Sequence, residues 1–149
     1  MKRILFILFT VGAITACLRN NDGEDLGRAR EELNYNLSKW QDADIHDYQF
    51  IYNRFCFCLP MQDVVINVQA DKVDSAFYKL TGEYLTADQL VELPTIVSLF
   101  NTIEDAINRG AYKLTATYDD NYGYPVDVSI DYDKNAIDEE FGFNVSGFM

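Results

Sequence analysis

The spacing of hydrophobic and polar residues predicts the helices and strands of this chain. Over residues 28–42, Leu33, Leu37 and Trp40 recur at steps of three or four among charged residues, which predicts an amphipathic helix. A tryptophan that closes such an apolar stripe is usually part of a protein core. We therefore expect this helix to pack on a sheet through Trp40.

A second helix is predicted after Pro94. Thr95 can cap its first turn, and Gly110 stands where a helix that ends at Arg109 would be terminated. The side chains expected to form its buried stripe are Ile96, Leu99, Phe100, Ile103, Ala106 and Ile107.

Shorter runs, most of them with alternating apolar and polar residues, predict strands. The expected strands are residues 47–59, 64–69, 73–80, 111–118, 126–132 and 141–148. Thr86 can open a short helical turn in the longer connection that follows the third strand. Short connections favour antiparallel neighbours. The order αβββ-αβββ therefore predicts a single α+β domain, in which two helices pack on an antiparallel sheet of about six strands.

The first predicted strand is the most aromatic part of the chain. Tyr48, Phe50 and Tyr52 share one parity along it, while Ile51 and Phe55 share the other. Because apolar residues occur at both parities, we expect this strand to be covered on both faces, at least towards its end.

The first sixteen residues have the pattern of a secretory signal peptide. Lys2 and Arg3 precede an apolar run over residues 4–11, and small residues follow it. The run is too short to span a bilayer, which needs about 20 apolar residues. We expect residues 1–16 to be removed from the mature protein.

The segment Ile14-Thr15-Ala16-Cys17 resembles a bacterial lipobox, in which an aliphatic residue and two small residues precede a cysteine. The resemblance implies diacylation of Cys17 through a thioether, cleavage before it, and addition of an acyl chain such as palmitate to the new amino terminus. Several acyl chains give stable membrane anchoring, since each buried CH2 contributes about 0.8 kcal/mol. Residues 17–27 are then expected to be a flexible tether, and residues 28–149 the folded domain. The expected location is a bacterial cell envelope, with the leaflet left open.

The charge of the mature chain excludes one class of partner. Removing Lys2 and Arg3 from the twelve basic residues leaves ten against twenty-four acidic residues, a formal charge of −14. Nucleic-acid binding needs clustered Lys and Arg, so we expect no nucleic-acid partner. The same charge argues against adhesion to anionic lipids, which leaves membrane attachment to Cys17.

Cys56 and Cys58 are the two cysteines that remain once Cys17 is assigned to the lipid anchor. On an extended strand they would point the same way about 6.6 Å apart, near the upper limit for the Cα separation of a disulfide. A disulfide would therefore need a local bend, and it is the interpretation we prefer in an oxidising envelope. Two buried thiols, or a redox or metal site, are the alternatives.

No motif in the sequence predicts catalysis or a cofactor. The chain has no nucleophile elbow, H-E-x-x-H motif or phosphate-binding glycine loop, and no nucleophile is near the single His46 in the sequence. Asp131 and Asp133 resemble the start of an EF-hand loop, but Ala136 and Gly142 stand where that loop needs a Gly and a bidentate Glu. We expect no enzymatic activity, no metal site and no cofactor, with weak calcium binding at this acidic turn as the alternative.

The turn before the fifth strand is the best candidate contact surface. Tyr122, Tyr124 and Pro125 can present aromatic and apolar groups to a partner, and Asp127 and Asp131 extend this surface along the next strand. For tyrosines in such a turn, packing back onto the sheet is the somewhat more common outcome.

Several segments, in this order, resemble a family of small bacterial secreted or lipid-anchored proteins classed as a domain of unknown function. They are Trp40 with Tyr48 and Tyr52, Cys56-Phe57-Cys58-Leu59-Pro60, Thr95-Ile96-Val97-Ser98-Leu99-Phe100, Tyr118-Asp119, Tyr122-Gly123-Tyr124-Pro125, Ile130-Asp131-Tyr132 and Asp138-Glu139-Glu140. Ala70-Asp71-Lys72 departs from the D-G turn usual in that family, which leaves the hairpin type open. The resemblance implies a fold and a location and supplies no activity.

These observations predict a membrane-anchored envelope lipoprotein whose domain is a non-catalytic binding or interaction module. Its partner is expected to be a protein or a small molecule of unknown identity. Two alternatives stay open. One is a thiol-redox or metal-handling protein that acts through Cys56 and Cys58, and the other is a periplasmic inhibitor of another enzyme, which is an analogy at the level of fold.

Overall fold

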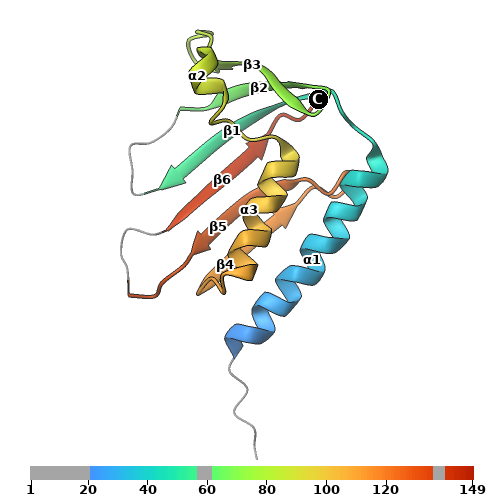
Figure 1. Ribbon diagram of the computed structural model, residues 1–149, viewed down its shortest axis with the longest axis vertical. Helices are drawn as coiled ribbons and strands as arrows, with labels where there is room; N and C mark the ends of the chain where they lie inside the picture. Colours follow the sequence, from blue (N-terminus) through green and yellow to red (C-terminus); the bar gives the residue numbers. More distant parts are fainter. Residues whose placement is uncertain (1–20, 57–61, 136–139) are drawn as a thin grey trace, which may run out of the picture.

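The computed structural model describes residues 21–56, 62–135 and 140–149, with side chains from Asp25 onward. Within these residues the chain forms three helices and six strands (Figure 1). In chain order the elements are α1 (Asn21–Ala43), β1 (Tyr48–Cys56), β2 (Val64–Gln69), β3 (Lys72–Tyr78), α2 (Ala87–Leu90), α3 (Ile96–Asn108), β4 (Lys113–Tyr118), β5 (Pro125–Asp131) and β6 (Phe141–Ser146).

The strands form one antiparallel sheet in the order β3-β2-β1-β6-β5-β4. Each group of three consecutive strands is a meander, and the two groups join where β1 pairs with β6. Helices α1 and α3 lie side by side on one face of the sheet (Figure 1), and α1 packs on both α3 and β4. The predicted α+β fold with αβββ-αβββ order is confirmed, and α2 adds a short third helix beside β3.

Helix α1 begins at Asn21, earlier than the predicted start at residue 28. Leu33 and Trp40 are buried and Leu37 packs against the same core, so the predicted stripe and the core position of Trp40 are confirmed. Acidic residues near the start of a helix stabilise it, because they interact favourably with the positive end of the helix dipole. The segment before residue 28 is rich in acidic residues. Residues 21–27, which were expected to belong to a flexible tether, are part of α1, and residues 17–20 lie outside the described part of the chain.

Helix α3 matches its prediction closely. The Thr95 hydroxyl accepts a hydrogen bond from the Ser98 N–H at 3.3 Å, and the Ser98 hydroxyl accepts one from the Thr95 N–H at 2.8 Å. Gly110, at a φ of 69°, follows the last turn in the left-handed region that favours glycine. All six residues of the predicted apolar stripe are buried.

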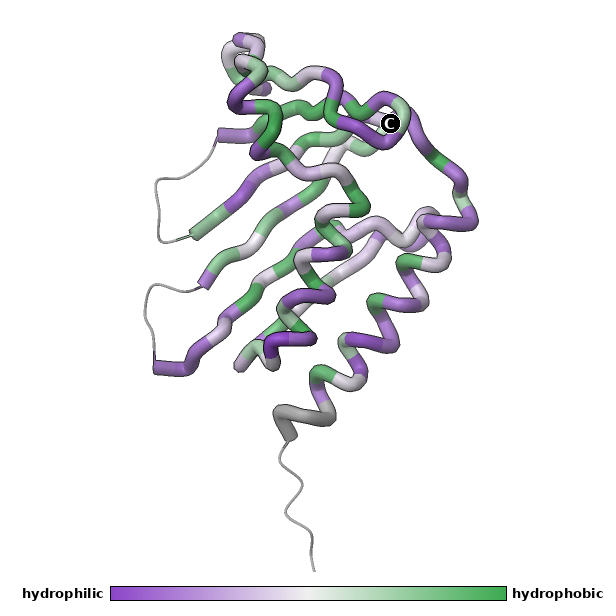
Figure 2. Tube along the Cα trace, in the orientation of Figure 1, coloured by the Kyte–Doolittle hydropathy of each residue, from purple (hydrophilic) through white to green (hydrophobic). Residues whose placement is uncertain are grey.

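The core lies between the two long helices and the sheet. Hydrophobic and hydrophilic stretches alternate along the strands, while α1 carries isolated hydrophobic positions on a mostly hydrophilic helix (Figure 2). The Trp40 ring makes edge contacts with Tyr48, at 5.3 Å between ring centroids, and with Phe148, at 5.7 Å. Among the described residues, the buried hydrophobic side chains fall between Leu33 and Val145 in sequence, so a chain that starts at Leu18 keeps this core.

Strand β1 is covered by helices on one face only. Tyr48, Phe50 and Tyr52 are buried beneath the helices, as their shared parity predicted. On the opposite face Phe55 is 44% exposed, so the expectation that this strand is covered on both faces is wrong for its described part. The Phe55 ring lies instead across the backbone of Gly142 in the neighbouring strand β6.

Candidate functional site

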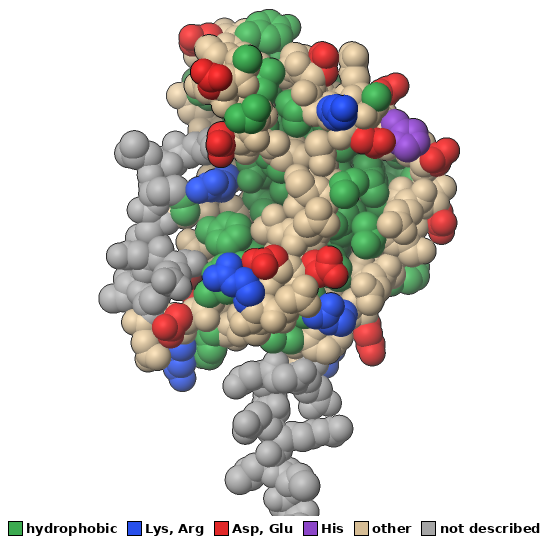
Figure 3. Space-filling model, in the orientation of Figure 1, with side chains coloured by type: hydrophobic (Ala, Val, Ile, Leu, Met, Phe, Trp, Pro, Cys, Tyr) green, Lys and Arg blue, Asp and Glu red, His purple; other side chains and the backbone are tan. Residues whose placement is uncertain are grey.

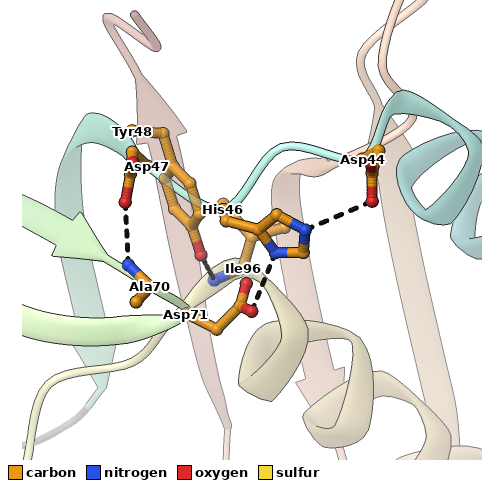
Figure 4. Close-up of polar contacts among 7 residues, drawn as sticks. All are labelled: Asp44, His46, Asp47, Tyr48, Ala70, Asp71 and Ile96. Carbon is orange, nitrogen blue, oxygen red and sulfur yellow. Dashed lines mark hydrogen bonds and ion pairs between the residues drawn. The ribbon is translucent and has the colours of Figure 1, made fainter.

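Four segments that are far apart in the sequence meet at one corner of the domain (Figure 4). These are the end of α1, the link from α1 to β1, the turn between β2 and β3, and the start of α3. We call this region the His46 corner and define it by Asp44, His46, Asp71 and Thr95.

The backbone at the His46 corner is unusual. Asp44, Ala70 and Asp71 have φ values of 51°, 48° and 65°, and they are the only residues other than glycine with positive φ in the described part of the chain. Asp44 ends α1, where its N–H donates to the Gln41 carbonyl at 3.2 Å. Ala70 and Asp71 form a two-residue hairpin turn with positive φ at both positions, the arrangement of a type I′ turn. Each such residue costs about 1 kcal/mol or more, which neighbouring contacts must offset.

His46 lies between two carboxylates. Its Nδ1 is 2.8 Å from Oδ2 of Asp71, and its Nε2 is 3.2 Å from Oδ1 of Asp44. An imidazolium can donate from both ring nitrogens, and a neutral imidazole from only one. The hydrogen bond to Asp71, followed by the charge of Asp71 and the contacts with Asp44, therefore raises the pKa of His46 above its ordinary value of 6.5.

Two hydrogen bonds donated by backbone N–H groups join the turn to the link, and Figure 4 draws the one from Ala70 to Asp47. The Asp71 N–H donates to the His46 carbonyl at 3.1 Å, and the Ala70 N–H donates to Oδ1 of Asp47 at 2.8 Å. Below them the Tyr48 hydroxyl accepts a hydrogen bond from the Ile96 N–H at 3.1 Å, which ties β1 to the start of α3. Burial raises the pKa of Tyr48, so its phenol stays neutral.

A groove of about 480 Å³ opens beside His46. Its apolar walls are formed by Leu37, Trp40, Ile45 and Val97. Its polar rim is formed by Gln41, Asp44, His46, Asp71 and Thr95. Figure 3 shows this side of the molecule, with a hollowed apolar area next to His46 and acidic side chains around it. Its size lies within the range of ligand sites, which occupy about 300–1,000 Å³, and its lining combines apolar walls with a polar rim. We call it the His46 groove.

Comparison with protein families places the chain in a group without an assigned role. The model of a family of unknown function (DUF6174) matches residues 32–149. The chain belongs to DUF6174. The match begins within α1 and includes the sheet, α3 and every residue of the His46 groove. No curated protein and no solved structure matches the chain.

In this DUF6174 chain, the predicted contact turn packs largely onto the core. Tyr124 is 8% exposed and stacks on Phe148 at 4.6 Å between centroids, and Pro125 is fully buried. A Cβ at Gly123 would collide with the Asn36 carbonyl in α1, which shows how closely this turn approaches the helix. The structure therefore assigns Tyr124 and Pro125 to the core and leaves Tyr122, at 43% exposure, as the accessible part of the expected surface.

The two acidic residues of the expected contact surface lie on the sheet face opposite α1 and α3. Asp127 is exposed and accepts a hydrogen bond from the Asn144 side chain at 3.4 Å, while Asp131 is partly exposed and pairs in register with Lys113. Asp131 also accepts the N–H of Asp133 at 3.1 Å in the acidic turn that follows. Among the described residues, no three His, Cys, Asp or Glu side chains are placed to hold a metal ion.

The cysteine predictions fall largely outside the described residues. Cys56 is the last residue of β1, whereas Cys17 and Cys58 belong to the segments that the structure does not describe. The acylation of Cys17 and the pairing of Cys56 with Cys58 therefore stay predictions.

Sequence reasoning noted His46 only as an isolated histidine and missed the site that it forms. Asp71 lies 25 positions away in the sequence, and the hairpin turn is what brings it to His46. The available signal was the two-residue turn Ala70-Asp71. Because β1 and β2 are antiparallel, with Tyr48 opposite Val68, the turn that follows β2 lies beside the link that precedes β1.

The contacts of His46 predict how stability depends on pH. A folded-state pKa above 6.5 means that the interaction stabilises the domain fully below about pH 6.5 and is lost as pH rises through the folded pKa. We expect His46→Gln to lower the denaturant midpoint of unfolding at about pH 5.5, and to have little effect above the folded pKa. Chemical unfolding of both proteins across this range measures the difference. A His46→Gln effect of equal size at every pH would contradict a role for the charged imidazole.

Proposed function

We propose that this chain is a lipid-anchored protein of the bacterial cell envelope, and that its domain is a non-catalytic binding module whose recognition site is the His46 groove. The signal pattern of residues 1–16 and the lipobox-like segment before Cys17 support the anchor. Among the described residues no helix is both long and apolar enough to cross a bilayer.

The engagement of both His46 ring nitrogens is the observation that favours binding over catalysis. A general base needs a ring nitrogen that is free to accept a proton from a reacting group. Here Nδ1 and Nε2 each face a carboxylate, and the hydrogen bond to Asp71 is the main cause that raises the pKa of the imidazole. Thr95 is the hydroxyl-bearing residue of the groove, and its hydroxyl caps α3. The site therefore offers shape and charge to a ligand, without an activated nucleophile.

Site-directed photo-crosslinking tests this proposal. Val97 is 44% exposed in the groove, and a benzophenone amino acid at this position should form adducts in native membranes. The same amino acid at Tyr35, on the exposed side of α1, should not form these adducts. An excess of the soluble chain from Leu18 should suppress the Val97 adducts. The same chain with Val97→Trp, which fills the groove, should not.

Two results would overturn the proposal. Adducts of the same masses at Tyr35 and Val97 would show that the groove has no special role. Equal suppression by the wild-type chain and by the Val97→Trp chain would show that the partner is held elsewhere. Comparing the circular dichroism of the two soluble chains checks that Val97→Trp has not disrupted the fold.

A further inference from the structure

We propose that the occupant of the His46 groove is a cationic peptide segment, with an apolar side chain against the groove walls and a basic group at the acidic rim. This inference rests on the proposed function, because it names the ligand class of the same groove. It is carried by the shape of the groove together with the distribution of charge around it.

The walls of the groove suit an apolar side chain. Leu37, Trp40 and Ile45 come from the end of α1 and the link that follows, and Val97 comes from the first turn of α3. Val97 is 44% exposed although it is a large hydrophobic residue. Covering it with a ligand side chain would remove apolar surface from water, which favours binding.

The rim of the groove suits a positive charge. Asp44 and Asp71 are 86% and 57% exposed at their side chains, and they are joined nearby by Asp42 and Asp47, which are also exposed. The carbonyl end of α1 adds a partial negative charge, and no basic residue lies in its last turn to offset it. The groups that can offset this negative charge are the exposed Lys72 and His46 itself.

The start of α3 does not reverse this preference. A helix N-terminus attracts anions through free N–H groups. Here the Ile96 N–H donates to the Tyr48 hydroxyl, and the Ser98 N–H donates to the Thr95 hydroxyl. No ionisable side chain occurs from Thr95 to Ser98. Two of the first-turn donors are therefore occupied, and the carboxylates dominate the rim.

His46 makes binding of a cation dependent on pH. Below its folded pKa the imidazolium neutralises part of the charge of Asp44 and Asp71, and above that pKa the carboxylates regain it. A ligand cation and the His46 proton therefore compete for the same two carboxylates. Affinity should rise as pH rises through the pKa of His46, and by linkage the bound cation should lower that pKa.

NMR titration of the soluble chain from Leu18 with two blocked pentapeptides tests the inference. The probes are Gly-Lys-Leu-Lys-Gly and its uncharged counterpart Gly-Gln-Leu-Gln-Gly. The lysine peptide should shift the amide signals of Ile45, Asp71 and Val97, and its affinity should rise about two- to fivefold from about pH 6 to pH 8.5. Saturation with this peptide should lower the pKa of His46, as read from its ring signals.

Matched variants separate the groove from the general acidity of the chain. Asp71→Asn should weaken binding of the lysine peptide at the higher pH, whereas Asp74→Asn, which removes an exposed carboxylate of β3 outside the groove lining, should not. His46→Gln should bind with little dependence on pH, because the competing proton is gone.

Three outcomes would overturn the cationic ligand class. These are equal binding of the two peptides in the groove, an affinity of the lysine peptide that does not change with pH, and equal effects of Asp71→Asn and Asp74→Asn. Each of these leaves the groove crosslinks at Val97 intact, so failure of this inference is distinguishable from failure of the proposed function. Loss of the Val97 crosslinks would remove both.

Discussion

Replacing Gly142 with alanine is expected to destabilise the domain by about 2–3 kcal/mol, although only one methyl group is added. Gly142 lies in β6 at the centre of the sheet, between β1 and β5. A Cβ there would clash with the Val128 carbonyl oxygen and with the Phe55 ring. The ring could turn away, but the Val128 carbonyl belongs to the backbone of β5 and cannot move without disturbing the strand pairing.

Gly27→Ala is the matched control for this prediction. A Cβ at Gly27 meets no atom within 4 Å, and the residue lies within α1. Alanine should therefore stabilise the domain by about 0.5–1 kcal/mol, because glycine loses more backbone entropy in a helix. Urea unfolding of the three proteins measures both changes. A neutral effect of Gly142→Ala would contradict the close approach of the Val128 carbonyl to Gly142.

Replacing Cys17 with serine is expected to move the protein from the membrane fraction to the soluble fraction. In the proposed protein, the acyl chains on Cys17 attach the chain to the membrane. The strong negative charge of the mature chain repels anionic lipid headgroups and so gives no second means of attachment. Serine lacks the thiol that forms the thioether. Metabolic labelling with an alkyne fatty acid, followed by fractionation, should show loss of label and loss of sedimentation together.

Cys56→Ser serves as the control for the anchor. It changes a cysteine at the end of β1 and leaves the lipobox-like segment intact, so label and sedimentation should be retained. A Cys17→Ser protein that still sediments with membranes in high salt would contradict lipid anchoring. It would point to attachment through the folded domain.

Local patterns were sufficient to predict most of the fold. The stripe of α3 from Ile96 to Ile107 follows from helical spacing and a nearby capping residue, both of which are properties of adjacent residues. The strand alternation from Val126 to Ile130 is equally local, and Val128 and Ile130 are fully buried as it required. Where a single element and its immediate flanks decide the outcome, sequence reasoning succeeded.

Features that depend on distant residues could not be read in the same way. The apolar residue Phe55 suggested a strand covered on both faces, but its ring covers Gly142 of a strand that lies far along the chain. His46 likewise acquires its role only when the hairpin turn delivers Asp71. The packing of the tyrosine turn also depends on distant residues, because Tyr124 contacts Trp40 and Phe148.

The pairing of β1 with β6 sets the order in which the domain can fold. Cys56 pairs with Phe141, 85 positions later in the chain, and Gln49 exchanges two backbone hydrogen bonds of 3.0 Å with the final residue, Met149. A chain made from its N-terminus therefore keeps the centre of its sheet open until the last strand has been synthesised. Such long-range closure is slow, because the loop must be ordered before the contact is gained. We therefore expect the sheet to be completed only after β6 has been made, because β6 is the strand that pairs with both β1 and β5.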